Sequence, residues 1–285
     1  MRLSAFFRCA IPGAIMLTVT GCSTVLHTDD VLAYQVSNPI YLDRYYQADW
    51  FEADQHKLEE ITLRQSDGQL SRGLRLSVKG SQNTVVYYGG SPYREKSNDI
   101  DIMGQFAFLG LNVVTFKNRG IDNDGEWPSL AQLKQDAESV YDYVRKLYPD
   151  EFLIIHGTAM SSFWVADIAT QQDVQALVLE GAVTTVQELV DENNKLAWLQ
   201  KVDIADDLNA LDNYQTLQAF DGPVLLLTAE DDADVPAELA ERLYGTLPTM
   251  KKSIALVPNS DEQDLLLHDD SLAAYTMFIH KYGFE

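Results

Sequence analysis

The chain has 285 residues, of which 46% are hydrophobic, 10% aromatic and 22% charged. These fractions are typical of a folded domain with a full core, and they exclude a disordered or fibrous chain. Acidic residues outnumber basic ones by 43 to 21, which gives a net charge of −22. Such a surface repels phosphate groups, so nucleic acids are excluded as partners.

The first 21 residues have the pattern of a secretory signal peptide. Arg2 and Arg8 flank a short start, and a mostly apolar run over 9–20 is followed by small residues. A membrane-spanning helix needs about 20 apolar residues, so this run is too short to be one. We therefore expect residues 1–21 to be absent from the mature protein, which makes its net charge two units more negative.

The sequence VTGC at residues 19–22 resembles the bacterial lipobox, in which the cysteine becomes the acylated first residue of the mature chain. The resemblance implies a membrane anchor at Cys22, and because Ser23 follows instead of an aspartate, it implies an outer-membrane lipoprotein that faces the periplasm or the cell surface. Cys9 leaves with the signal peptide, so Cys22 is the only thiol left and no intramolecular disulfide can form.

Residues 22–57 are interpreted as the lipidated N-terminus and a tether, and residues 58–285 as one domain. Strand and helix patterns alternate in this domain, which predicts an α/β fold with a mostly parallel, twisted sheet and helices on both faces. The predicted strands cover 58–63, 74–78, 84–88, 112–116, 152–156, 176–179, 224–228 and 253–257. The predicted helices cover 101–109, 129–147, 162–171, 237–244 and 271–282.

Two parts of this order are more specific. The turn Asp67-Gly68 joins the first two strands into a hairpin at an edge of the sheet. Residues 183–219 interrupt the alternation with helical patches over 186–193 and 208–220. This segment is either a small helical cap over the strand ends or an ordinary two-helix crossover, and the pattern favours neither.

Chemistry in an open α/β sheet gathers at the C-terminal ends of the strands. The strand over 152–156 runs into the sequence GTAMS and then into a helix, which is the context of the G-x-S-x-G nucleophile elbow. Gly157 and Ser161 supply the small residues that the tight turn requires. The central position, which should carry a hydroxyl, is Ala159.

Other motifs agree with this one in order and spacing. They are Gly89-Gly90 after the third strand, Arg119-Gly120 after the fourth, Asp232 after the strand over 224–228, and Asp264-Leu265 after the last strand. From residue 58 onward the chain resembles the α/β-hydrolase superfamily, especially its monoglyceride-lipase and serine-aminopeptidase-like branch. The resemblance implies that Asp232 is the triad acid and that Glu262 stands where the family has its histidine.

A serine hydrolase needs an Oγ that attacks and an imidazole that takes the proton. Ala159 has no oxygen, and a carboxyl such as Glu262, with a reference pKa of about 4.3, is a poor replacement for the histidine. Loss of the nucleophile or the base alone costs roughly 10⁶ in turnover. The triad positions Ala159, Asp232 and Glu262 therefore predict a degenerate site and a pseudoenzyme.

Parts of the site are expected to persist without the triad. The backbone N–H groups of Met160 and of Ser91 are candidates to bind an oxyanion or a carboxylate, with plain connecting turns as the alternative. Asp232 and Glu262 are expected to face each other, with one pKa raised or with a cation borrowed from Arg94, Lys117 or Arg119. Ser161, Ser162, Thr158, His156 and His268 are the residues that a rescued reaction would have to use, and we expect none of them at the apex.

Tyr93, Trp127 and Trp198 are candidates for an apolar pocket, with plain core packing as the alternative for each. Acidic residues crowd the loops at 122–124, 231–234 and 261–264, but their spacing matches no EF-hand, and no metal is predicted. No P-loop or dinucleotide motif occurs, so the sequence indicates no cofactor.

Two hypotheses follow from the sequence. The first is a lipid-anchored envelope protein with a hydrolase fold that binds a small molecule or a protein at the strand ends without cleaving it. The second is an active ester, thioester or amide hydrolase that uses a displaced nucleophile.

Overall fold

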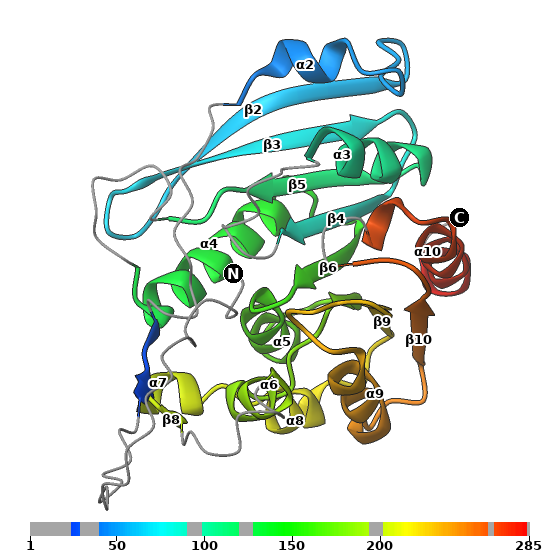
Figure 1. The fold of residues 1–285 in the computed structure, drawn as a ribbon. Helices are drawn as coiled ribbons and strands as arrows, with labels where there is room; N and C mark the ends of the chain where they lie inside the picture. The colour runs from blue at the N-terminus through cyan, green and yellow to red at the C-terminus, as the bar shows by residue number, and fades with distance from the viewer. Residues whose placement is uncertain are drawn as a thin grey trace, which may run out of the picture.

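The computed structural model describes residues 24–28, 40–89, 99–119, 128–193, 202–261 and 265–283. Its main element is an eight-stranded sheet with the strand order β10-β9-β7-β6-β4-β5-β3-β2 (Figure 1). The strands are β2 (His56–Arg64), β3 (Leu70–Val78), β4 (Asn83–Tyr88), β5 (Asn112–Phe116), β6 (Phe152–Thr158), β7 (Ala176–Glu180), β9 (Val224–Ala229) and β10 (Lys252–Val257).

The sheet is antiparallel only at one end. β2 and β3 form a hairpin, closed by a turn in which Gly68 has a φ of 91°, and β3 pairs antiparallel with β5. All other neighbouring strands of this sheet are parallel. The predicted mostly parallel sheet and its edge hairpin are therefore confirmed.

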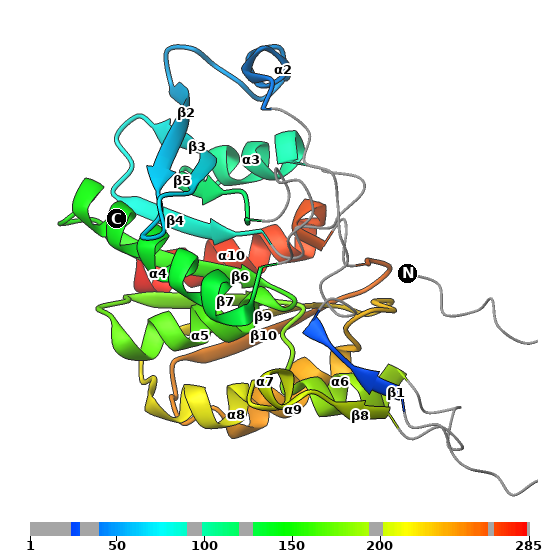
Figure 2. The same ribbon diagram turned by 90° about the vertical axis from the view of Figure 1, so that its left-hand side faces the viewer.

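Helices cover both faces of the sheet (Figures 1 and 2). α3 (Asp99–Phe108) and α10 (Asp269–Tyr282) pack on one face, and α4 (Leu130–Leu147), α5 (Ser161–Gln171) and α9 (Ala237–Thr246) pack on the other. α4 shows why such helices form where the sequence predicts them. Ser129 and Gln132 close a capping box at its start, and its buried residues recur every three or four positions.

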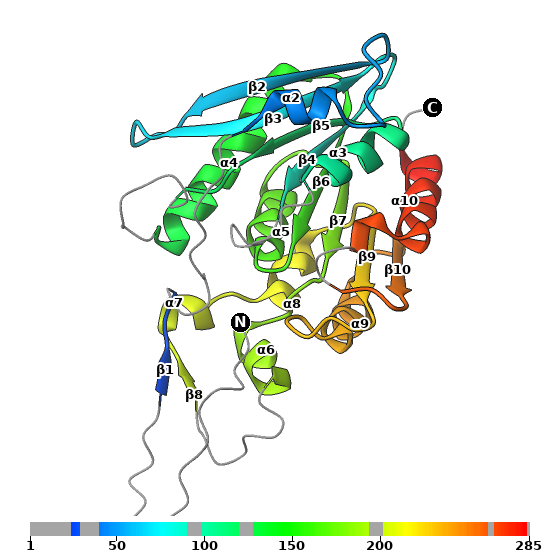
Figure 3. The ribbon, with the colours of Figure 1, turned by 45° about the horizontal axis from the view of Figure 1, so that its top comes forward.

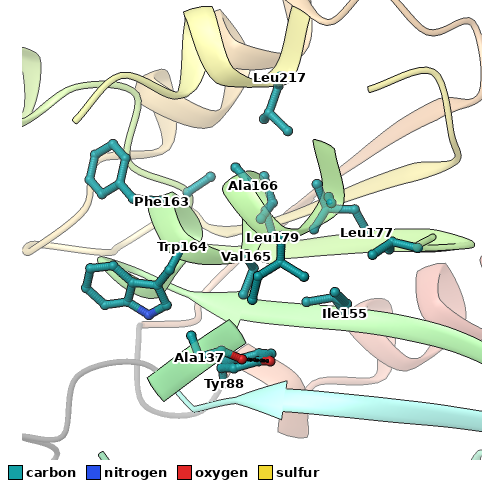
Figure 4. Packing of buried hydrophobic residues seen from close by; sticks show 14 of the residues in the cluster. Tyr88, Ala137, Ile155, Phe163, Trp164, Val165, Ala166, Leu177, Leu179 and Leu217 are labelled. Atoms are coloured by element: carbon teal, nitrogen blue, oxygen red, sulfur yellow. Dashed lines mark hydrogen bonds between the residues drawn. The ribbon is translucent and has the colours of Figure 1, made fainter. Parts of the chain in front are cut away.

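The core consists of two apolar clusters separated by the sheet. β4, β6, β7 and β9 are buried along their whole length, so successive side chains enter the two clusters alternately. In the cluster on the α5 side, Val165 and Ala166 lie over Ile155 and Leu179 (Figure 4). The hydroxyl of Tyr88 donates a 2.8 Å hydrogen bond to a backbone carbonyl of α4, so its one polar atom is satisfied inside this cluster.

The chain before residue 58 also contains packed structure. It forms α2 (Leu42–Tyr46), in which Tyr45 is buried in the second cluster. Trp50 packs so closely on α3 that a Cβ placed on Gly104 would come within 2.5 Å of its ring. Within the expected tether over 22–57, residues 40–57 therefore contain packed structure, which the burial of these aromatic side chains stabilises.

The segment between β7 and β9 contains α6 (Val186–Asn193), β8 (Val202–Ile204), α7 (Asp206–Asn209), α8 (Asn213–Thr216) and the 3₁₀ turn η1 (Leu217–Ala219). The predicted helix over 186–193 is confirmed, whereas the helical patch over 208–220 is divided into three short pieces. β8 pairs in parallel with β1 (Thr24–Leu26), which the sequence did not predict (Figure 3). The interpretation of 183–219 as a cap stays a prediction.

None of the helices in the described part of the chain combines the length and the apolar composition that crossing a bilayer requires.

Candidate active site

The turn from β6 into α5 has the backbone of a nucleophile elbow. Ala159 stands between the two elements with a φ of 47°, and only Asn259 shares a positive φ among the described non-glycine residues. This left-handed conformation costs a non-glycine residue roughly 1–2 kcal/mol. The turn therefore keeps a strained geometry although the residue at its apex carries a methyl group and no hydroxyl.

Hydrogen bonds from both sides hold this conformation. The backbone N–H of Ala159 donates to the carbonyl of Glu180 on β7 over 2.9 Å, and the N–H of Ser162 donates to the carbonyl of Ala159 over 3.0 Å. Met160 is the N-cap residue of α5 and, like Ala159, is partly exposed. The elbow is thus fixed to the neighbouring strand and to the first turn of the helix.

Gly157 allows β6 and α5 to approach each other, as the small residue of the elbow motif should. A Cβ at this position would lie 2.5 and 2.9 Å from the two methyl groups of Val165 and 3.2 Å from the carbonyl of Ser161. Val165 is fully buried, so it has little room to yield. The glycine is therefore required by the strand-helix contact.

We expect Gly157→Ala to destabilise the protein by about 1–3 kcal/mol, because the added methyl overpacks a buried contact. The measurement is the urea midpoint of the purified variant. Gly245→Ala is the matched control, since a Cβ at Gly245 in α9 has nothing within 4 Å. That substitution should be neutral or stabilise by up to about 1 kcal/mol. Equal midpoints for the two variants would contradict this account of the elbow.

The serines that follow the apex are buried inside the domain. Ser161 and Ser162 are 1% and 0% exposed. The Oγ of Ser162 accepts hydrogen bonds from the side-chain amide of Asn213 at 3.0 Å and from the backbone N–H of Val183 at 3.4 Å. Thr158 is 1% exposed as well. As expected from the elbow geometry, none of these hydroxyls occupies the exposed apex.

Asp232 lies in the loop after β9, where the family resemblance puts the triad acid. It is 8% exposed, and its Oδ1 accepts the backbone N–H groups of Asp234 at 2.9 Å and Val235 at 2.7 Å. Its Oδ2 lies 3.5 Å from the point where Gly181 would carry a Cβ. Because Gly181 directly follows Glu180, the strand end that holds the elbow also borders the acid.

Several predicted site residues lie outside the part of the chain that the structure describes. They are Cys22, Ser91, Tyr93, Arg94, Trp127, Trp198 and Glu262. The described residues contain no group of three or more His, Cys, Asp or Glu side chains arranged to hold a metal ion.

Arg119 is not free to neutralise the acidic pair, contrary to one of the expectations above. Its guanidinium is bound by both carboxylate oxygens of Asp136 at 2.5 and 2.6 Å, and it also pairs with Asp67. The hydrogen bonds that Arg119 donates to the carboxylate of Asp136 are the main reason why the pKa of Arg119 lies above its ordinary value. The residue ties α4 to the turn of the edge hairpin, which is a structural role.

A buried polar pair that the sequence did not indicate lies beneath the elbow. His156 on β6 is fully buried, and its Nε2 is 3.1 Å from Oε2 of Glu180 on β7. Its Nδ1 is 3.5 Å from the hydroxyl of Tyr275 on α10. Burial, followed by the charge of Glu180, raises the pKa of Tyr275 well above its ordinary value, so this hydroxyl stays protonated and can donate.

These partners assign the proton of a neutral His156 to Nε2, where it faces the carboxylate. The rings of Tyr87 and Phe106 surround the imidazole edge-to-face, with centroids 5.0 and 6.0 Å away. His156 therefore cannot serve as a base at the exposed apex. The signal that could have found the pair is Glu180, a carboxylate at the end of an otherwise apolar strand.

The architecture and the elbow together are those of the α/β-hydrolase fold, and comparisons with known proteins agree. No family model matches the chain. The "Lysophosphatidylserine lipase ABHD12" of Danio rerio is 24% identical over 220 residues, which cover 72% of this chain and 56% of the lipase. The protein bem46 of Schizosaccharomyces pombe is 23% identical over 169 residues, which cover 58% of this chain and 56% of bem46. The chain thus spans about half the length of the curated relatives it matches.

Among solved structures, the esterase Pf2001 of Pyrococcus furiosus superposes with a TM-score of 0.66 at 12% identity. The match covers 88% of this chain and 98% of the esterase. The chain therefore has the α/β-hydrolase fold, as its motifs predicted.

Proposed function

We propose that this protein is a lipid-anchored protein of the cell envelope that uses the α/β-hydrolase fold to bind a ligand without hydrolysing it. The observation that carries the proposal is the methyl group of Ala159 at the apex of a strained, fully formed elbow. Since the neighbouring serines are buried in packing, the turn presents no nucleophile to a substrate. Cys22 is the proposed anchor, in the outer membrane and facing the periplasm or the cell surface.

The retained strain supports a site that is still used. The left-handed conformation of Ala159 costs about 1 kcal/mol or more, and a binding role for the turn would account for its retention. The backbone N–H of Met160 follows the apex, which is where the family places an oxyanion donor. Such a donor suits a carboxylate or ester carbonyl. The relatives named as lysophosphatidylserine lipases support an acyl-ester amphiphile as the ligand class.

The inactive half of the proposal is tested with the purified wild-type protein, a fluorophosphonate probe and p-nitrophenyl butyrate. We expect no probe adduct and no turnover above a heat-denatured sample, because a triad without nucleophile and base loses roughly 10⁶ in rate. A stoichiometric adduct on any serine, found by peptide mass spectrometry, would instead establish the second hypothesis, an active hydrolase with a displaced nucleophile.

The binding half is tested by equilibrium titration with a fluorescent lysophospholipid below its critical micelle concentration. Ala159→Leu should weaken binding by about tenfold or more, since a larger side chain at the apex fills the place of the ester group. Ala273→Leu is the matched control, because Ala273 is an exposed residue of α10. Equal affinities for wild type and Ala159→Leu would show that the apex does not contact the ligand.

A further inference from the structure

The first described residues of the chain are part of a small sheet on the outside of the domain. β1 and β8 pair in parallel with Thr24 opposite Val202 and Leu26 opposite Ile204. The pairing continues beyond the strands, because the N–H of Ala205 donates to the carbonyl of Leu26 over 3.0 Å. Leu26 and Ile204 pack against the same apolar cluster as Ala159, so both strands are in contact with the domain core.

This small sheet is connected to the candidate site by direct contacts. α6 packs against β8 and α7. At the end of α6, the side-chain amide of Asn193 donates to the carbonyl of Asp234 over 3.1 Å. The N–H of Asp234 in turn donates to Oδ1 of Asp232. Figure 2 shows β1 and β8 on the side of the molecule toward which β4 points, which is the side of the strand C-terminal ends.

The sequence places the proposed anchor next to this sheet. Cys22 precedes Thr24 by two residues, and a fully extended chain gains at most about 3.6 Å per residue. The Cα atom of an acylated Cys22 can therefore lie no more than about 7 Å from that of Thr24. An acyl chain has to be buried in a leaflet to contribute its binding energy, so the anchor also brings the membrane surface close to β1.

We infer that the face formed by β1, β8 and α7 lies against the lipid leaflet, so that the candidate site opens toward the membrane surface. This inference rests on the proposed lipid anchor at Cys22. Its consequence is that a ligand of the site reaches it from the bilayer, as a membrane amphiphile would, and not from bulk solvent. The partner of this face is thus the phospholipid leaflet itself.

Charge does not hold this face on the membrane. Asp203, Asp206 and Asp207 lie on β8 and α7, and anionic headgroups would repel them at short range. The apposition therefore depends on the short covalent connection, and it should persist at salt concentrations that screen charges beyond about 10 Å. A zwitterionic leaflet is the appropriate partner for a test.

The test uses the full-length lipidated protein in phosphatidylcholine vesicles. Because acylation would leave the mature chain without a free thiol, single introduced cysteines can be labelled with a fluorophore. Val25→Cys and Asn209→Cys report on the proposed contact face, since both positions are exposed. Asp150→Cys and Met250→Cys are the matched controls at the opposite end, just before β6 and β10. Nitroxide-labelled headgroups quench fluorophores that lie near the leaflet.

We expect several-fold stronger quenching at the two positions of the contact face than at the two control positions. Equal quenching, or stronger quenching at the controls, would overturn the inference while leaving the anchor intact. Recovery of the wild-type protein in the soluble fraction, without an acyl group on Cys22 by mass spectrometry, would overturn the proposed anchor and the inference with it.

A second variant separates orientation from attachment. Twelve Gly/Ser residues inserted between Ser23 and Thr24 add a flexible connection with a root-mean-square length of about 20 Å. The protein should remain membrane-bound, and the difference in quenching between the two faces should fall toward zero. An undiminished difference would show that something other than the short connection orients the domain, which would also contradict the inference.

Discussion

Ala159→Ser combined with Glu262→His is expected to create measurable ester hydrolysis, at least about 10²-fold above the wild-type protein. The elbow already has the φ of 47° that would turn an Oγ outward, so the new hydroxyl needs no rearrangement of the backbone. Asp232 is already held by two backbone N–H groups and can orient an imidazole. The measurement is the release of p-nitrophenol, together with fluorophosphonate labelling at position 159.

The single variants are the informative controls. Nucleophile and base act as one unit, so Ala159→Ser alone and Glu262→His alone should stay near the wild-type rate. Adding Asp232→Ala to the double variant should abolish most of the gain, because the acid of such a triad contributes about 10⁴ in turnover. A double variant without activity, yet folded and as stable as the wild type, would mean that position 262 does not face the elbow.

The sheet was predictable because its strands are long and apolar and its helices amphipathic. β5 and α6 have the bounds that the sequence predicted, and most other elements differ by one to three residues. Such patterns follow from which side chains are buried, and the hydrophobic periodicity of a single sequence shows this directly. The hairpin turn was predictable for a different reason, since Gly68 is needed for a φ of 91°.

The elements that the sequence missed are those whose stability comes from distant partners. β1 and β8 have three residues each, and no strand of that length has a recognisable pattern until its partner is known. α2 has five residues, and its Tyr46 packs edge-on against Phe51 and donates a 3.0 Å hydrogen bond to the carbonyl of Leu58 on β2. The patch over 208–220 had helical spacing, but Asp212 within it forms an isolated antiparallel bridge with Thr185 between α7 and α8.

The candidate site was predictable only in part. The positions of Ala159 and Asp232 followed from motif order, because strand ends at one edge of a parallel sheet must converge. Motif order could not show whether Arg119 pairs with the acidic residues of the site, because an arginine after a strand can also pair with a carboxylate elsewhere in the domain. In the structure, the carboxylate of Asp136 on α4 binds the Arg119 guanidinium bidentately.

The pair of His156 and Glu180 was missed for a related reason. A histidine inside an apolar strand looks like an ordinary buried residue, and its partner is 24 residues away on the next strand. The pair matters because the backbone carbonyl of Glu180 also holds the elbow. Its side chain and its main chain thus connect the core to the site.

Breaking this pair should produce the largest loss of stability of any change considered above. We expect His156→Leu and Glu180→Leu each to lower the free energy of unfolding by about 3–5 kcal/mol, because each leaves a buried polar group without its main partner. The double variant should cost clearly less than the sum, since two apolar side chains of similar size leave no buried charge. Urea unfolding of all four proteins gives the coupling free energy.

An exposed pair provides the matched control. Lys57 and Glu59 lie 2.9 Å apart with side chains 67% and 32% exposed, so Lys57→Ala should cost less than about 1 kcal/mol. If a single leucine variant is too unstable to purify, Glu180→Gln keeps a hydrogen-bond acceptor for His156 and should lose less. Additive losses in the double variant would mean that His156 and Glu180 do not interact. The elbow would then depend on the strand backbone alone.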